Sequence, residues 1–438
     1  LPFFNEFTNR NMEFNIFSFW YTIPIILLGV IVIGVISGSY PAFVLSKFMP
    51  IAVLKEKIQN TKSGRWLRSS LVVFQFFISS TLFICTIIVY QQLNYVENKK
   101  LGFNKDNVII LQRAWALENN KETFGSELLK NKDIVAVGGT EDLIGDQYSN
   151  SLFQIHYDGQ ESRTMFSISA IDSGLKDVFK LKIHEGRFFN KDYGIDSLSV
   201  VINETAVKTL GIKNPLESYI TQFTRRGEIK LKIIGVIKDY NFETLHLSIK
   251  PLLLTYRPNA SRYYCIRYNT QNLPELLKYI ENTWNKVAPG RVFSYVFMDE
   301  NYHKLYESEQ KLGTIFIICS GLAVFIACLG LFGLAAFTIE QKTKEIGIRK
   351  TLGATVTSIM IKYIKSFLKY VVIANLVSIP VAYFLMSKWL NNFAYKIDID
   401  ITPFAYAVIL STVIALITIA YQVLKAALAN PIKSLKYE

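Results

Sequence analysis

Five long runs of apolar residues constrain this chain more than any other feature of its sequence. Each run reaches the roughly 20 residues that an α-helix needs to cross about 30 Å of hydrocarbon. None carries a charge near its middle, and Lys369 and Lys388 stand only at the two ends of the fourth run. Long helices of a soluble core are the alternative, but five such runs in one chain favour a membrane protein. The runs are 21–45, 71–93, 312–339, 367–389 and 403–424.

The basic residues are concentrated between these runs. The chain has a formal net charge of +13, yet residues 94–310 are almost balanced, with 28 basic and 27 acidic residues. The excess lies in 46–70, 340–366 and 425–438, which the positive-inside rule places in the cytoplasm. The segments on the other side are then 1–20, 94–310 and 390–402. The charge therefore indicates membrane orientation, and nucleic acid is not expected as a partner, because the basic stretches lack the interleaved aromatic residues that stack on bases.

Two parts of the chain resemble one another. Asn-Glu-Phe at 5–7 and Asn-Asn-Phe at 391–393 each precede an apolar run, and Pro-Ile-x-x-Leu-Lys follows at 50–55 and at 431–436. Chance similarity of two membrane helices is the alternative, but matched flanks on both sides favour an internal repeat. We expect the chain to contain the last helix of one unit and a complete second unit. The natural protein is then about twice this long, with this chain as its C-terminal half.

One motif names a family. Residues 345–354 are Glu-Ile-Gly-Ile-Arg-Lys-Thr-Leu-Gly-Ala. They resemble the signature of the FtsX-like, MacB-type ABC transporter permeases, in which Glu-Ile-x-Ile-Arg-(Arg/Lys)-x-Leu-Gly-Ala follows the second helix of a unit. The resemblance extends over essentially the whole chain, and its tandem form is similar to the double-length permeases of the Bacteroidetes type. The other matching stretches are Ser39–Ala42, Pro50–Lys55 and Asn430–Lys436 at the ends of units, and 201–206 and 234–242 in the outer segment.

The residues around this motif predict a short helix beside the membrane. Glu345 and Arg349 are spaced to form an i,i+4 ion pair. Gly353 can end this helix and Thr355 can cap the next one. Apolar residues at spacings of three and four predict one apolar stripe on a helix. The stripe consists of Ile348, Leu352, Val356, Ile359 and Tyr363.

The resemblance implies that this segment is a coupling helix that docks on the ATPase subunit. The alternative is a solvated loop whose Lys and Arg residues only meet anionic lipid. The docking residues that the resemblance implies are Lys344, Glu345, Ile346, Gly347, Ile348, Arg349, Lys350, Leu352, Gly353 and Ala354.

The outer segment, 94–310, has a mixed α and β pattern. Asn203 is expected to cap a helix that Gly211 ends after Leu210. A second helix starts at Pro274. Alternation predicts strands at 230–237 and 293–297. The resemblance implies a porter-like lobe built from both ends of the segment, with a second lobe inserted around 165–228.

The two helices that flank the outer segment are expected to extend beyond the membrane. Asp299 can cap one helix over 300–339, about 60 Å long at about 1.5 Å per residue. Residues 71–100, ended by Gly102, can do the same, and the two together would form a stalk. The alternative is separate helices broken at the membrane interface. Small residues that predict close helix packing are Gly34, Gly38, Ala323, Ala327, Gly330 and Gly333.

Several chemistries lack support in the sequence. It has no Gly-x-x-x-x-Gly-Lys-Ser/Thr, so ATP is expected to be bound and hydrolysed by a partner. The four His residues are isolated and form no metal-ligand pattern. Neither a Ser/His/Asp nor a Cys/His constellation is present. We therefore expect no catalytic residue, metal or cofactor, and no enzyme.

These observations predict an α-helical membrane protein with five transmembrane helices and a mixed α/β extracytoplasmic domain. The resemblance implies that this domain consists of a porter-like lobe and an inserted lobe. The resemblance implies the permease subunit of an ABC transporter in the bacterial inner membrane, which relays ATP-driven motion outward to export peptides, small toxic compounds or lipoproteins. The implied partners are an ABC ATPase, the missing repeat unit or a second permease copy, a periplasmic or outer-membrane partner, and the bilayer. The alternative is a membrane receptor or scaffold that binds an outer ligand or cell-wall hydrolase and a cytoplasmic regulator.

Overall fold

The computed structural model describes residues 22–46, 62–224, 227–258 and 262–428, and these residues form two compact units. The helical unit contains the described residues up to Ile88, together with 311–384 and those from Asp400 onward. The α/β unit contains Val89–Gln310 and Leu385–Ile399.

Some sequence predictions concern residues outside this description. These are segment 1–20, most of the loop 46–70 and most of the tail 425–438, and they include three of the four flanking motifs of the internal repeat. The repeat therefore stays a prediction.

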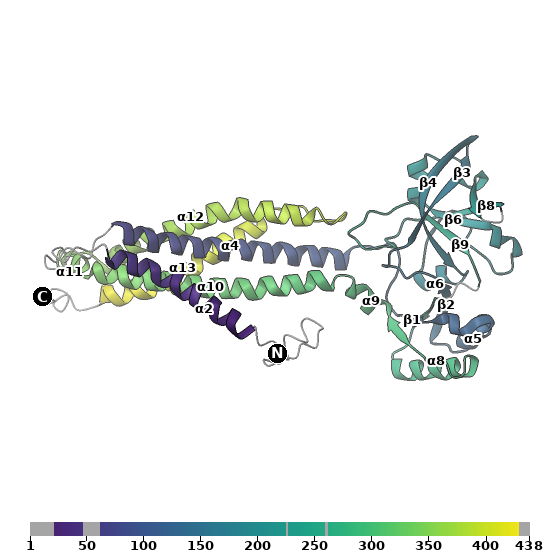
Figure 1. The fold of residues 1–438 in the computed structure, drawn as a ribbon, viewed down its shortest axis with the longest axis horizontal. Coiled ribbons are helices and arrows are strands. Elements are labelled where there is room, and N and C mark those ends of the chain that lie inside the picture. The colour runs from purple at the N-terminus through teal and green to yellow at the C-terminus, as the bar shows by residue number, and fades with distance from the viewer. Residues whose placement is uncertain (1–21, 47–61, 225–226, 259–261, 429–438) are drawn as a thin grey trace. The chain divides into compact units, whose positions relative to one another are not determined.

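Long helices dominate the helical unit (Figure 1). Four helices of the described chain are long and apolar enough to cross a membrane, namely α4 from Arg68, α10, α12 and α13. In α2 the described apolar stretch is the shorter Ile23–Val35, so the expected count of five spans is approximate. The helices are α2 (Thr22–Ser46), α4 (Lys62–Asn98), α10 (Glu307–Gln341), α11 (Thr343–Thr351), α12 (Val356–Leu390) and α13 (Thr402–Leu428).

The single helix predicted over 300–339 is wrong. Helix α9 (Met298–Lys304) is separated from α10 by a turn at Leu305 and Tyr306. The turn is held by a contact from elsewhere in the chain, since the Tyr306 hydroxyl accepts a hydrogen bond from the Leu245 backbone N–H at 2.8 Å. Asp299 lies in the first turn of α9 and does not cap it.

The α/β unit contains eleven strands and several short helices. Its strands are β1 (Val108–Gln112), β2 (Ile134–Thr140), β3 (Ser149–Tyr157), β4 (Gln160–Ile171), β5 (Ile183–Gly186), β6 (Ser199–Asn203), β7 (Tyr219–Thr224), β8 (Gly227–Ile237), β9 (Leu252–Tyr256), β10 (Tyr263–Tyr268) and β11 (Tyr295–Phe297). Its helices besides α9 are η2 (Ala114–Asn120), α5 (Lys121–Leu128), α6 (Leu175–Phe179), η3 (Gly194–Leu198), α7 (Glu204–Leu210), η4 (Pro215–Glu217) and α8 (Leu273–Val287).

The first lobe is an antiparallel sheet in the order β11-β1-β10-β2, which both ends of the outer segment build. Helices α5 and α8 pack on it through a core that includes Phe124, Ile280 and Trp284 (Figure 1). The sequence predicts β8 and β11 because alternation is local to each strand, although it does not say which distant strands pair with them.

The second lobe is a closed ring of strands in the order β4-β3-β7-β8-β6-β9. The ring closes because β9 pairs in parallel with β4, with Ser167 opposite Leu252. Its interior is filled by residues such as Phe166, Ile202 and Ile233. The predicted limits 165–228 are too narrow, because β3 pairs with β4 along its whole length and β9 completes the ring.

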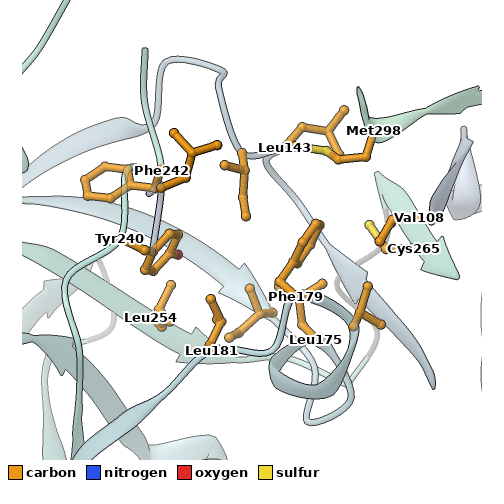
Figure 2. Close-up of a cluster of buried hydrophobic side chains, with 14 of the residues drawn as sticks. Val108, Leu143, Leu175, Phe179, Leu181, Tyr240, Phe242, Leu254, Cys265 and Met298 are labelled. Atoms are coloured by element: carbon orange, nitrogen blue, oxygen red, sulfur yellow. The ribbon is translucent and has the colours of Figure 1, made fainter. Parts of the chain in front are cut away.

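The two lobes share a hydrophobic core (Figure 2). Val108 and Met298 come from the first lobe and its continuation into α9, whereas Leu254 lies on β9 of the ring. Tyr240 and Phe242, which follow β8, fill the space beside them. The lobes therefore form one compact body.

The helix predicted after Asn203 is confirmed in detail. The Asn203 carboxamide oxygen accepts a hydrogen bond from the Ala206 N–H at 3.1 Å, and Gly211 ends α7 with φ of 69°. The same side chain is fully buried and also donates to Asp239 and to the Lys250 carbonyl, each at 3.0 Å. Asn203 thus joins the helix to two other segments of the ring.

Candidate functional site

The family-like motif lies on a short helix between two long ones. We call residues 342–355 the coupling segment; it comprises α11 and the turns on either side. Gly353 follows α11 with φ of +90°, and the Ala354 N–H donates to the Arg349 carbonyl at 2.9 Å. The Thr355 hydroxyl accepts from the Ser358 N–H at 3.2 Å and so caps α12. Both turn residues have the roles that the sequence predicts.

Glu345 is the electrostatic centre of this segment. Its carboxylate accepts from Lys362 at 2.6 Å, from Lys342 at 2.9 Å and from Arg349 at 3.1 Å. The hydrogen bonds from Lys362 and Lys342 lead the causes that lower the pKa of Glu345 to about 2. Because Lys362 belongs to α12, this carboxylate ties α11 to the start of the next long helix.

The apolar residues of the segment divide between an inner and an outer face. Ile346 is 3% exposed and packs in the core of the helical unit, together with Ile359 and Tyr363. Ile348 is 45% exposed and Leu352 is 82% exposed. The single stripe predicted from Ile348 to Tyr363 is therefore wrong. The turn at Gly353 separates α11 from α12. The apolar residues therefore keep a helical spacing in the sequence but do not lie on one face of a single helix.

The remaining predicted docking residues lie around this outer face. Glu345 is partly exposed, Gly347 is buried, Arg349 is exposed, and Lys350 donates to the Ala427 carbonyl of α13 at 2.7 Å. Gly353 and Ala354 form the turn, and Lys344 lies in the first turn of α11. Ile348 and Leu352, four residues apart, give the helix an exposed apolar pair bordered by cations. Such a face fits an apolar groove with an acidic rim.

The small residues predicted for helix packing have different surroundings. Ala327 is 1% exposed and Ala323 is partly exposed. A Cβ added to Gly330 would collide with the Gln75 carboxamide of α4, so this glycine permits a close contact. A Cβ added to Gly34 or Gly333 would meet no atom of the described chain within 4 Å, and Gly38 lies in α2.

A second group of interacting residues joins the strands and loops of the α/β unit to the ends of the long helices that belong to the same unit. We call it the outer junction; it comprises Gln92 and Lys99 of α4, residues 245–246 with Tyr306 and Glu309, and residues 393–397 after α12. Gln92 is fully buried. It donates to the Tyr395 carbonyl at 3.0 Å and accepts from the Ile397 N–H at 3.0 Å. The Lys99 ammonium lies 4.0 Å from the centroid of the Tyr395 ring.

His246 forms the other half of the outer junction. Its ring stacks on Phe393 with centroids 4.3 Å apart, and its Nε2 lies 3.2 Å from a carboxylate oxygen of Glu309 at the start of α10. The His246 carbonyl accepts from the Ala394 N–H at 3.1 Å. One loop between β8 and β9 thus contacts both the start of α10 and the segment that follows α12.

Sequence reasoning did not find the outer junction or the cations around Glu345 other than Arg349. Gln92 and Tyr395 are 303 residues apart, and Glu345 and Lys362 are 17 apart. Neither pair therefore has a spacing that a helix or a strand would bring together. His246 looks isolated in the sequence for the same reason. Within the described residues, no group of three or more His, Cys, Asp or Glu residues could hold a metal ion.

Comparison with known proteins finds similarity in part of the chain to one family of permeases. The model of the FtsX-like permease C-terminal domain matches residues 317–431, which include α11 and α12. The ABC transporter permease YknZ of Bacillus subtilis is 21% identical over 329 residues, which are 70% of this chain and 78% of YknZ. The macrolide export ATP-binding/permease protein MacB of Bdellovibrio bacteriovorus is 21% identical over 274 residues, 58% of this chain. The chain spans 41% of the length of that MacB.

Solved structures give a weaker match. The periplasmic region of MacB from Actinobacillus actinomycetemcomitans aligns with a TM-score of 0.33 and 14% identity, over 46% of this chain and 93% of that one. The extracellular domain of YknZ from Gram-positive bacteria aligns with a TM-score of 0.29 and 16% identity, over 43% of this chain and 98% of that one.

Proposed function

Because residues 317–431 match the FtsX-like permease C-terminal domain, we propose that this chain relays ATP-driven motion from a separate ATPase to its extracytoplasmic domain. It is a multi-pass protein of the cytoplasmic membrane, and its relatives are permeases of ABC transporters, a class that works with an ATPase. The relay, and the export of peptides, small toxic compounds or lipoproteins that it would drive, are our proposal.

The observation that carries this proposal is the exposed pair Ile348 and Leu352 on the coupling segment. In water, exposed apolar side chains at i,i+4 on a short helix are typical of a docking face. The three cations on Glu345 fix the orientation of that face relative to α12. To transmit force, α11 must be firmly attached to α12, because a force on α11 then moves α12 as well.

The ATPase is proposed as a separate subunit. The 438 residues contain no P-loop pattern that could cradle the phosphates of ATP. The MacB relative has ATP binding in its name, and this chain spans 41% of its length. We therefore propose that ATP is bound outside these 438 residues, by a partner.

The outer junction supports the other end of the relay. Gln92, His246 and Glu309 connect the α/β fold to the ends of α4, α10 and α12 by part-buried hydrogen bonds, ring stacking and a contact between the His246 imidazole and the Glu309 carboxylate. Three helix ends, rather than the two of the predicted stalk, then act on the outer domain. A shift of any of them would have to move the loop between β8 and β9.

The test is a double variant of the exposed face, Arg349→Glu with Leu352→Asp. The complex is purified from native membranes in mild detergent, and co-purifying P-loop ATPases are quantified by mass spectrometry. We expect the variant to lose the ATPase and its ATP hydrolysis. The matched control is Lys132→Glu with Ile401→Asp, which makes the same charge change at exposed positions, because Ile401 is 80% exposed. If binding and stimulation survive in the first variant, the docking assignment is wrong.

A further inference from the structure

A large open groove lies on the outer surface of the strand ring in the α/β unit. Its volume is about 830 Å³, and it lies where β8 meets the short helices η3 and η4. Pockets that hold small ligands usually measure about 300–1,000 Å³. Lys230, Lys232 and Ile234 of β8 line its floor, together with the buried Ile233, whereas Leu231 packs inside the ring.

One wall of the groove is apolar and exposed. Ile195 is 70% exposed and Leu198 is 51% exposed, both on η3, and Leu216 of η4 lies across from them. Burying side chains of this size against a ligand is favourable, because it removes apolar surface from water. The groove therefore offers a hydrocarbon-binding surface that the described residues leave exposed.

This wall is held in place before any ligand arrives. Asp196 is fully buried and receives two hydrogen bonds from the Arg187 guanidinium, at 2.6 and 2.7 Å. The Asn190 N–H donates to the same carboxylate at 2.8 Å. These bonds fix η3 between Ile195 and Leu198. A preformed wall loses little conformational entropy on binding.

The floor of the groove is positively charged. Lys230 and Lys232 are exposed, and neither makes an ion pair with a described residue. Lys232 lies between Ser199 of β6 and Tyr219 of β7 across the sheet, and the Lys230 ammonium is 5.1 Å from the centroid of the Tyr219 ring. Arg187 is neutralised by Asp196, and Glu217 is the acidic residue of the lining. The two lysines thus leave an excess of positive charge beside an apolar wall.

We propose that this groove binds a single-chain amphiphile with an anionic head. The apolar chain lies against Ile195, Leu198 and Leu216, and the carboxylate or phosphate head lies at Lys230 and Lys232. A neutral hydrocarbon would leave the lysines unused, and a cationic amphiphile would meet like charge. The groove lies wholly within the α/β unit, so binding here depends neither on the ATPase nor on the relay.

The experiment uses the full chain in nanodiscs of zwitterionic phosphatidylcholine, without ATP. The probe is a twelve-carbon fatty acid with a photoreactive diazirine in its chain, and the labelled peptides are mapped by mass spectrometry. Probes with the same chain and an amine or a phosphate head are run in parallel. We expect the acid and the phosphate to label peptides from η3, η4 and β8, and the amine to label them at least fivefold less.

Two variants test the two halves of the groove. Lys230→Gln with Lys232→Gln should lower labelling by the acid about five- to twentyfold, because each exposed charge contact contributes about two- to fivefold. Leu198→Ser should lower labelling by the acid and the phosphate alike. The matched control, Lys182→Gln with Lys213→Gln, removes two exposed lysines of the same unit outside the groove and should leave labelling unchanged.

Three results would overturn the proposal. One is equal labelling by the acid and the amine, and another is labelling confined to peptides outside the groove. The third is displacement of the probe by an acidic peptide but not by unlabelled laurate, which would make the groove a peptide site. In each case the permease proposal would be unaffected, since ATPase docking is measured separately.

Discussion

Replacing Gln92 by Leu should open the outer junction without touching the coupling segment. Gln92 is fully buried and satisfies the Tyr395 carbonyl and the Ile397 N–H, each at 3.0 Å. Leucine has a similar volume but can form neither bond. Each buried backbone group left unpaired costs about 1–3 kcal/mol, and the low end, about 1–1.5 kcal/mol for each group, applies because the loop is partly exposed and water can reach it.

The two lost bonds should therefore cost the local structure about 2–3 kcal/mol. Since about 1.4 kcal/mol corresponds to a factor of ten, the Ile397 amide should exchange its hydrogen about 30- to 150-fold faster. The assay is hydrogen–deuterium exchange of the nanodisc-embedded chain, resolved to single amides. Amides of β1 and β10 serve as the internal reference for global folding.

The matched control is Gln91→Leu. Gln91 is the preceding residue on α4 and is only partly buried, and its side chain makes no hydrogen bond to a described residue. It should leave Ile397 exchange unchanged. If Gln92→Leu changes this exchange by less than threefold while the reference amides stay protected, the bonds do not hold the junction and the reasoning is refuted. ATPase binding should survive in both variants, because the coupling segment is intact.

Three further changes test other parts of the structure. Glu345→Gln should destabilise the chain by about 1–2 kcal/mol after allowance for solvent screening. Folding lowers the pKa of Glu345 from 4.5 to about 2, so the difference in thermal stability between the two proteins should be fully present above pH 4.5. It should vanish as the pH falls to 2. Asn203→Ala removes a helix cap and leaves buried groups unpaired, so thermal or chemical unfolding should show that the free energy of unfolding falls by about 3–5 kcal/mol. A fall of less than about 1 kcal/mol would contradict the assigned bonds. Gly330→Ala displaces the Gln75 carboxamide, so it should raise the melting temperature less than Gly333→Ala, which gains helix propensity without a collision; equal effects would rule out this contact.

The parts of the site that sequence could predict are those fixed by neighbouring residues. The Glu345–Arg349 pair follows from helical spacing, and the roles of Gly353 and Thr355 follow from the backbone conformations and hydrogen bonds of turns. The membrane helices follow from length and apolarity, because hydrocarbon demands that every backbone group be bonded within the helix. Asn203 and Gly211 define α7 for similarly local reasons.

The parts that could not be predicted depend on segments that meet only in the folded chain. Whether Ile348 faces water while Ile346 is buried depends on how α11 lies against α12 and α13. The break before α10 depends on a loop that contacts Tyr306. The closure of the strand ring depends on β9 reaching β4, which no alternation within either strand encodes.

The central claim is that the exposed face of α11 contacts an ATPase, and a photo-crosslinking amino acid at position 352 tests it most directly. The crosslinker replaces Leu352 in native membranes, and a second variant carries it in place of Ile401, which is equally exposed at 80%. After irradiation, adducts are identified by mass spectrometry. We predict a P-loop ATPase adduct from position 352 and none from position 401. A complex shown to be intact that yields no ATPase adduct from 352, or yields a regulator or hydrolase instead, would contradict the account and favour a receptor or scaffold.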